Sequence, residues 1–296
     1  MNPDSEYNLS RVRSATREIH AGESVPKPSP TLSSRAAGAL LGLAAGRALA
    51  LGSAPDGSLP LTWILAEELA AGRRDLRELA HRWVDQADRD AGAVDRETAA
   101  ALAHLARHDE PPARAAGQGS DPLVRCVPVA LAAFDAPRTL VSATYHVAAL
   151  THPDPLVAWS AVAVNVTLAR FLQGKRDFVP DVVEALRSND VPDELLARVR
   201  RVPLPATADR PDLAPGTALG DALAALRLAY HEPLLERGLR AVAAPGPAAA
   251  ARAGLAGALL GGRDSSYAIP PDWTVFDGAG IMQALAARLV RATAVA

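Results

Sequence analysis

The stretch Gly38-Ala39-Leu40-Leu41-Gly42 returns near the other end of the chain as Gly257-Ala258-Leu259-Leu260-Gly261. Residues four apart share one face of an α-helix, so each copy places two glycines on one face, and Gly46 extends the first copy. Glycine inside a helix costs about 1 kcal/mol relative to alanine, so it usually serves a close approach of two backbones. The repeat therefore predicts helices over 36–51 and 248–262 that lie side by side at the centre of the fold. The alternative is two unrelated helices rich in alanine and glycine.

Helical periodicity continues through most of the sequence between these two segments. Asp75, Asp95 and Asp154 each precede such a segment and can cap its first turn. Stretches rich in proline and glycine at 109–122 and 203–215 indicate loops. No stretch alternates apolar and polar residues with β-branched side chains over the length of a strand. The pattern predicts an all-α fold.

Composition and charge predict a soluble protein. The 296 residues are 49% hydrophobic and 22% charged, with a net charge of -2, which excludes wholesale disorder and disfavours a nucleic-acid partner. We expect a disordered polar tail over 1–32 and a single domain over 33–296. The longest apolar runs fall short of the roughly 20 residues of a membrane span and contain Arg47 and Arg252, and no signal peptide is recognisable. With Cys126 as the lone cysteine, we expect a cytoplasmic protein with no membrane partner.

Four segments, in this order, resemble the ADP-ribosylglycohydrolase family, the relatives of dinitrogenase-reductase-activating glycohydrolase. They are GALLGLAAGRAL (38–49), GQGSDPLVRCVPVAL (117–131), THPDP (151–155) and GLAGALLG (254–261), the last followed by Ile269-Pro270 and Trp273. They are similar to the family's opening helix, its Gly-Asn-Gly loop and following helix, a short hallmark, and its last core helix with an Ile-Pro-x-x-Trp ending. Each motif is weak alone, but together they span most of the chain. The resemblance implies a single-domain orthogonal bundle of α-helices.

The resemblance also implies two magnesium ions, and here the sequence departs from the family. The family holds the ions with a Thr-Asp-Asp-Thr run after the opening helix and an Asp-x-Asp-Thr run before the last core helix. The aspartate of the family's Gly-Asp-Ala-Leu-Gly is replaced by Arg47. Because alkyl groups cannot replace the hydration shell of Mg²⁺, we predict no binuclear centre and no cofactor. The two acidic runs fall on the following residues: Leu59, Pro60, Leu61 and Thr62, then Ala248, Ala249, Ala250 and Ala251.

Three arginines are candidates for binding an anionic ligand. Arg125 follows a glycine-rich loop whose backbone N–H groups could help it to hold a phosphate, or it could be an ordinary structural arginine. Arg47 and Arg252 border the emptied metal positions, where they would either supply the missing positive charge or face solvent. The loop residues in this hypothesis are Gly117, Gln118 and Gly119.

His152 and Asp154 lie in the THPDP hallmark and are the candidates for catalysis. They could form a histidine polarised by an acid, or Asp154 could cap a helix beside a packed His152. Three functions follow from these alternatives. The first is a pseudoenzyme that binds a nucleotide-like or phosphate-bearing small molecule, or regulates. The second is an enzyme with metal-independent chemistry in the old cleft. The third is a structural or interaction protein.

Overall fold

The computed structural model describes residues 29–53, 59–90, 92, 94–114, 117–205 and 215–292, and in these ranges it contains helices and no strand. The predicted all-α fold is thus confirmed, while residues 1–28 of the expected tail lie outside the described residues. The only β pairing in the described ranges is an isolated bridge between Gly119 and Thr217. The helices are α1 (Leu32–Leu51), α2 (Pro60–Ala70), α3 (Leu76–Arg89), α4 (Arg96–His108), α5 (Asp121–Arg125), α6 (Val127–Ala132), α7 (Pro137–Ala149), α8 (Pro155–Leu172), α9 (Val179–Arg187), α10 (Asp193–Arg200), α11 (Ala218–His231), α12 (Leu235–Val242), α13 (Pro247–Asp264) and α14 (Ala279–Ala292), with short 3₁₀ turns at Ser266–Ala268 and Pro271–Trp273.

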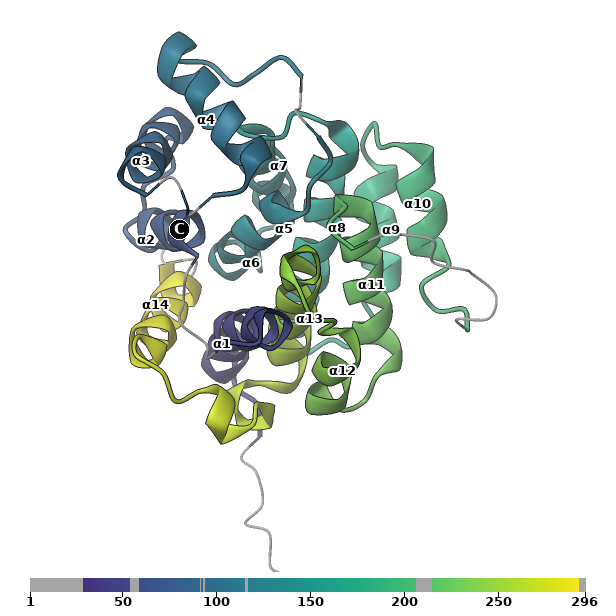
Figure 1. Ribbon diagram of the computed structural model, residues 1–296. Coiled ribbons are helices and arrows are strands. Elements are labelled where there is room, and N and C mark those ends of the chain that lie inside the picture. Colours follow the sequence, from purple (N-terminus) through teal and green to yellow (C-terminus); the bar gives the residue numbers. More distant parts are fainter. Residues whose placement is uncertain are drawn as a thin grey trace, which may run out of the picture.

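The centre of the fold is the contact between α1 and α13, which lie side by side in Figure 1. A Cβ placed on Gly42 would lie 2.1 Å from the carbonyl oxygen of Gly257, and a Cβ on Gly257 would lie 1.9 Å from that of Gly42. Gly38 and Gly261 face each other in the same way. Because no side chain fits between backbones this close, the glycines allow the contact, and the predicted pairing of the two helices is confirmed.

Apolar helices surround this central pair. Helices α8 and α11 pack on α13, α14 packs on α1, and α2 and α6 pack on α14. The buried residues are mainly alanine, leucine and valine, which fill the space between closely spaced helices. Helix α8 is long and apolar enough to cross a membrane, but 83% of it is buried inside the bundle, as in the core helix of a soluble protein.

Side-chain caps explain the starts of α1, α3, α4, α8 and α11. Helix α1 begins four residues before its expected start, and so also just before the expected domain boundary. A capping box accounts for this: the Ser34 N–H donates to Thr31 Oγ1 at 3.1 Å, and the Thr31 N–H donates to Ser34 Oγ at 2.8 Å. The three expected aspartate caps are confirmed, each with its carboxylate accepting from an N–H of the first turn: Asp75, Asp95 and Asp154.

The apolar run around Cys126 forms two short helices, α5 and α6, that meet at Cys126, rather than one long helix. Pro128 has no N–H to donate to the carbonyl oxygen of Val124, and its ring clashes with that carbonyl in a continuous helix. The break turns the chain between α5 and α6. As a result Arg125, the last residue of α5, is directed into the protein interior.

Candidate functional site

Residues 117–120 form a short loop where the N-terminal ends of three helices converge. The carboxylate of Glu97, in the first turn of α4, accepts from the Gly119 N–H at 3.0 Å. Gln118 donates through Nε2 to Oδ2 of Asp154, the cap of α8, at 2.8 Å. The carbonyl oxygen of Gln118 accepts from the N–H of Ala218, the first residue of α11, at 2.8 Å. Since each helix N-terminus carries partial positive charge, the loop lies in a region that favours anions.

His152 is fully buried beside this loop, and its two ring nitrogens have different partners. Nδ1 lies 3.1 Å from Thr151 Oγ1, and Nε2 lies 3.2 Å from Glu97 Oε2. Burial and the nearby charge of Arg125 lower the pKa of His152, so the ring is neutral at pH 7 and carries one proton. A carboxylate can only accept, so the hydrogen-bond network assigns that proton to Nε2, and the Thr151 hydroxyl donates to Nδ1.

Arg125 is 4% exposed and is held by partners inside the protein. Nη1 donates to Thr151 Oγ1 at 3.2 Å, Nη2 donates to Thr98 Oγ1 at 3.1 Å, and the guanidinium lies 5.2 Å from the ring centroid of Trp83. Through Thr151, Arg125 is joined to His152 by consecutive hydrogen bonds. The structure therefore connects Arg125, His152 and the loop, which the sequence predicted only as separate candidates.

A small cavity of about 50 Å³ brings together the residues that align with the family's first acidic run. Its volume is enough for a few water molecules but far below the 300–1,000 Å³ of a typical ligand pocket. Arg47 and Arg125 contribute the positive charge of the lining, and Asp95 and Asp121 the negative charge. The remaining lining residues are Leu59, Pro60, Leu61, Thr62, Val94, Thr98 and Val124.

Asp95 and Asp121, which both line this cavity, form a hydrogen bond when one of the two carboxyl groups is protonated. Burial and the hydrogen bond to Asp95 raise the pKa of Asp121 to about 6. Burial opposes the ionisation of Asp95, but hydrogen bonds from Asp121 and Thr98 outweigh it and lower the pKa of Asp95 to about 2. The buried Oδ2 of Asp95 accepts from no N–H or hydroxyl donor among the described residues. Below about pH 6 Asp121 is therefore protonated and can donate to the ionised Asp95.

The pair predicts an unusual pH dependence of stability. The folded-state pKa of Asp121 lies above the unfolded value of 3.8, so its contribution is present below pH 3.8 and is lost as the pH rises through 6. The free energy of unfolding is expected to fall by up to about 3 kcal/mol over that range. Asp121→Asn, whose amide donates permanently to Asp95, should abolish this fall and raise stability at pH 7. Urea unfolding of both proteins from pH 4 to 8 measures the effect; parallel pH profiles would contradict it.

Arg252 lies on α13 and pairs with a buried acid. Its Nε donates to Asp221 Oδ1 at 2.7 Å, and Asp221 is fully buried. Burial raises the pKa of Asp221, which hydrogen bonds from Ser120 and Arg252 partly oppose. This pair therefore ties α11 and α13 to the loop through Ser120. The alanines that align with the second acidic run, on the same helix, include three that are buried: Ala249, Ala250 and Ala251, whereas Ala248 is exposed.

The acid that contacts His152 was missed by the sequence analysis. Asp154 caps α8 and accepts from Gln118, whereas Glu97, 55 positions before His152, is the residue that faces its ring. Asp95 was recognised only as a cap, and Asp221 was not singled out. The sequence signal available for Glu97 was its position in the first turn of a predicted helix, which is common for acids without any further role.

Asp95, Glu97 and His152 each place one ligand-type atom within 4.8 Å of the others, a spacing that could hold a single cation. The hydrogen-bond network disfavours one. The proton on His152 Nε2 blocks the nitrogen that faces the two acids, and Arg125 already brings positive charge close to His152. Glu97 and His152 therefore form a hydrogen-bonded pair rather than part of a cation site.

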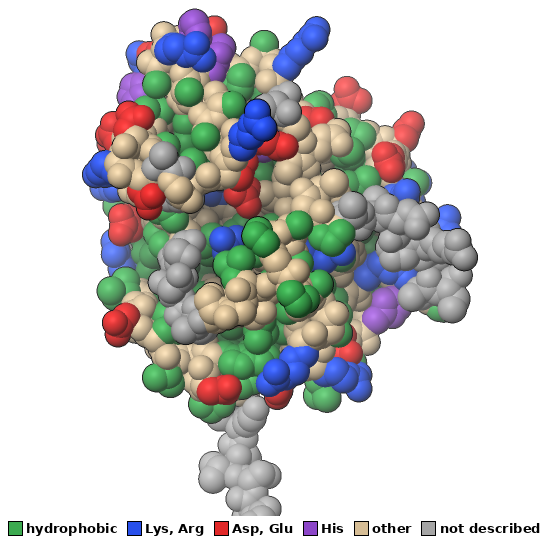
Figure 2. All heavy atoms as spheres, viewed as in Figure 1, with side chains coloured by type: hydrophobic (Ala, Val, Ile, Leu, Met, Phe, Trp, Pro, Cys, Tyr) green, Lys and Arg blue, Asp and Glu red, His purple; other side chains and the backbone are tan. Residues whose placement is uncertain are grey.

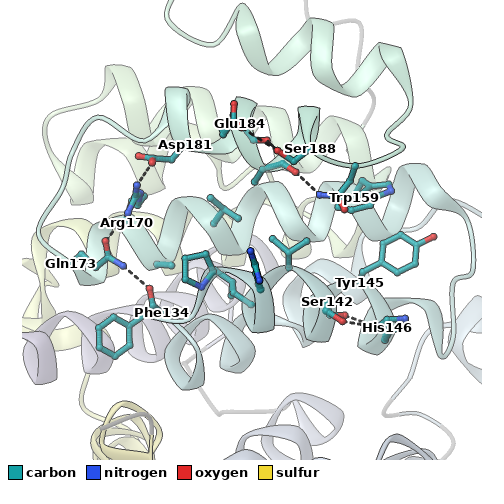
Figure 3. A pocket seen from close by; sticks show the side chains of 18 residues that line it. Phe134, Ser142, Tyr145, His146, Trp159, Arg170, Gln173, Asp181, Glu184 and Ser188 are labelled. Carbon is teal, nitrogen blue, oxygen red and sulfur yellow. Dashed lines mark hydrogen bonds and ion pairs between the residues drawn. The ribbon is translucent and has the colours of Figure 1, made fainter. Parts of the chain in front are cut away.

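A larger groove of about 790 Å³ lies between α7, α8 and α9, away from the predicted site residues (Figure 3). Tyr145 and Trp159 lie together on one side, with ring centroids 5.0 Å apart. Arg170 pairs with Asp181 at the other end. The groove has a largely apolar lining and was not predicted from any sequence motif. On the molecular face in Figure 2, basic and acidic side chains of the described residues are interspersed.

Two comparisons with known proteins give a consistent result. A sequence model described as ADP-ribosylglycohydrolase matches residues 28–296. A solved structure described as an ADP-ribosylglycohydrolase-related protein complex aligns with a TM-score of 0.73 and 26% identity, covering 88% of this chain and 99% of the other. No curated protein sequence matches significantly.

Proposed function

The chain belongs to the ADP-ribosylglycohydrolase family, and from this membership we propose that it is a divergent member without the binuclear magnesium centre. In this proposal it binds a phosphate-bearing, nucleotide-like small molecule without hydrolysing it, as a pseudoenzyme with a binding or regulatory role. The buried α8 and the lone cysteine support a soluble, cytoplasmic protein.

The observation that carries the proposal is the chemistry of the small cavity. Pro60 and Leu61 line it where the family has aspartates, and Leu59 lines it where the family has a threonine. None of the three has a side-chain oxygen. Arg47 lines the same cavity, and its positive charge opposes a divalent cation. Mg²⁺ requires a nearly complete octahedron of oxygen ligands, so these residues do not fit a pair of magnesium ions. Asp95 and Asp121 interact with each other and with the nearby arginines. The positive charge of Arg125 acts on both acids, and that of Arg47 acts on Asp121.

The proposal predicts that magnesium does not bind at the family's positions. Isothermal titration calorimetry of chelator-treated protein with millimolar Mg²⁺ or Mn²⁺ should show no two-ion titration. The melting temperature should also stay within about 1 °C, because a ligand that binds the folded state raises it by mass action. A two-site titration that EDTA reverses would contradict the proposal.

A second function, a metal-independent hydrolase, is favoured by one observation: the neutral His152 lies in contact with Glu97 and could transfer protons. The two functions separate when ADP-ribose and an ADP-ribosylated peptide are incubated with the protein in EDTA. Binding without product supports the pseudoenzyme. Product formation that His152→Ala abolishes establishes the hydrolase instead. Absence of both, together with self-association, favours a structural protein.

A further inference from the structure

The groove between α7, α8 and α9 has a basic end and an aromatic end, joined by an apolar lining (Figure 3). We propose that it binds a free fatty acid of about twelve carbons, with the carboxylate beside Arg138 and the methyl end toward Tyr145 and Trp159. This site is separate from the one in the proposed function, because no residue of the small cavity or of the 117–119 loop lines the groove.

The size and lining of the groove suit a flexible apolar chain. Its volume of about 790 Å³ lies within the range of about 300–1,000 Å³ for small-molecule sites. Helix α8 packs between α7 and α9 and contributes Val166 and Ala169 to the floor, while Leu140 and Val141 of α7 form part of one wall. A chain that covers these side chains removes apolar surface from water, which is favourable.

The length of the groove follows from α8. Trp159 and Arg170 line opposite ends and lie about 16 Å apart along this helix, at about 1.5 Å per residue. A zigzag chain of about twelve carbons, with C–C bonds of about 1.5 Å, has a similar extended length. At the far end the rings of Tyr145 and Trp159, with centroids 5.0 Å apart, offer uncharged surface to the methyl terminus.

Hydrogen bonds place the first turns of α7 and α9 at the Arg170 end. Arg170 pairs with Asp181, in the first turn of α9, and donates to Gln173 Oε1 at 2.9 Å. Gln173 Nε2 donates at 2.6 Å to the carbonyl oxygen of Phe134, shortly before α7 begins. Neither helix has a side-chain hydrogen bond at its N-cap, so both N-termini add partial positive charge, which Asp181 offsets only at α9.

Arg138 is the side chain available to a carboxylate at this end. It lies in the first turn of α7, lines the groove and has no hydrogen-bond or ion-pair partner among the residues that the structure describes. Arg170 and Asp181 neutralise each other, and the exposed Glu184, about one turn further along α9, accepts from Ser188 of its own helix at 3.2 Å. A fatty acid is complementary to this arrangement, because its single charge is an anion at the end of an apolar chain.

A chain-length series tests the site in the full-length protein. Isothermal titration calorimetry with sodium octanoate, decanoate and dodecanoate, each below its critical micelle concentration, should show about tenfold tighter binding for each added pair of methylene groups. Tetradecanoate should gain little over dodecanoate, because its additional methylene groups extend beyond the groove. Dodecylammonium, with the same chain and the opposite charge, should bind at least about tenfold more weakly than dodecanoate.

Two variants separate the basic end from the apolar lining. Arg138→Gln should weaken dodecanoate binding by about tenfold or more, the scale of a hydrogen bond to a charged group, without changing the melting temperature of the free protein. Val141→Trp fills part of the groove and should abolish binding at every chain length. Arg288→Gln is the matched control and should bind like wild type, because Arg288 is also exposed and without a partner among the described residues but lies on α14.

Three results would overturn the inference. The first is no detectable binding of dodecanoate at millimolar concentration, and the second is an affinity that does not depend on chain length. The third is unchanged dodecanoate binding in Arg138→Gln, or equal binding of dodecylammonium by wild type, since either would remove the carboxylate from the basic end. Circular dichroism verifies that Val141→Trp is folded, and if it is not, Arg138→Gln and the chain-length series still decide.

Discussion

Replacing Gly42 by alanine is expected to destabilise the protein by about 3 kcal/mol or more, at the upper end of the range for overpacked cores. The new methyl group would meet the backbone of Gly257 at 2.1 Å, and backbone atoms cannot rotate away as a side-chain end can. Helices α1 and α13 would have to move apart, which loosens the contacts along their whole length. Guanidinium unfolding followed by circular dichroism measures the loss.

Gly280→Ala is the matched control, since Gly280 is also helical but has no atom within 4 Å of an added Cβ. It should leave stability unchanged or raise it by up to about 1 kcal/mol, because alanine favours helix formation. Equal effects of Gly42→Ala and Gly280→Ala would show that the α1–α13 contact is not as close as described.

Arg125→Met is expected to lower the free energy of unfolding at pH 7 by about 3–5 kcal/mol, the scale for removing one partner from a buried charge network. Methionine keeps much of the volume but leaves Asp95 without the nearby cation and two threonine hydroxyls without their donors. The deficit should shrink as the pH falls through about 6, the pKa of Asp121, because protonation of that carboxyl removes part of the uncompensated negative charge. Urea unfolding at pH 3.5 and pH 7 tests both statements.

Arg240→Met provides the comparison, because Arg240 also stacks on a tryptophan ring, at 5.1 Å from Trp273, but is 58% exposed. Its loss should change stability by less than about 1 kcal/mol, as for other exposed ion pairs. A similar deficit in both variants would mean that stacking on tryptophan, rather than the buried charge network, stabilises the fold.

The central helix pair was predictable because its cause is local to two segments. Glycines four apart in both copies of Gly-Ala-Leu-Leu-Gly can be recognised without knowing the rest of the fold. The break at Cys126 was also encoded locally, in Pro128, but the apolar run around it favours one long helix. The early start of α1 depends on a reciprocal hydrogen bond between Thr31 and Ser34. A threonine and a serine three residues apart do not by themselves predict that bond.

The candidate site was predictable only in part. The loop and His152 were found because they lie in motifs. Their connection was not, because it depends on Glu97 and Thr98 of α4, which tertiary packing brings against residues some 55 and 27 positions away. The pairing of Asp95 with Asp121 has the same origin. Sequence spacing gives the face of a helix, but not which distant carboxylate will meet it.

The contact between α1 and α13 can form only late in synthesis, because the two helices lie near opposite ends of the chain. Arg35, at the start of α1, donates to the carbonyl oxygen of Gly262, 227 positions later. At a translation rate of 5–20 residues per second, α1 leaves the ribosome roughly 10–45 s before its partner helix exists. Throughout that time its glycine-lined apolar face has no native surface to cover it. A ribosome-bound chain that ends before α13 should therefore engage chaperones and be cleaved readily by proteases, whereas the completed chain should resist both.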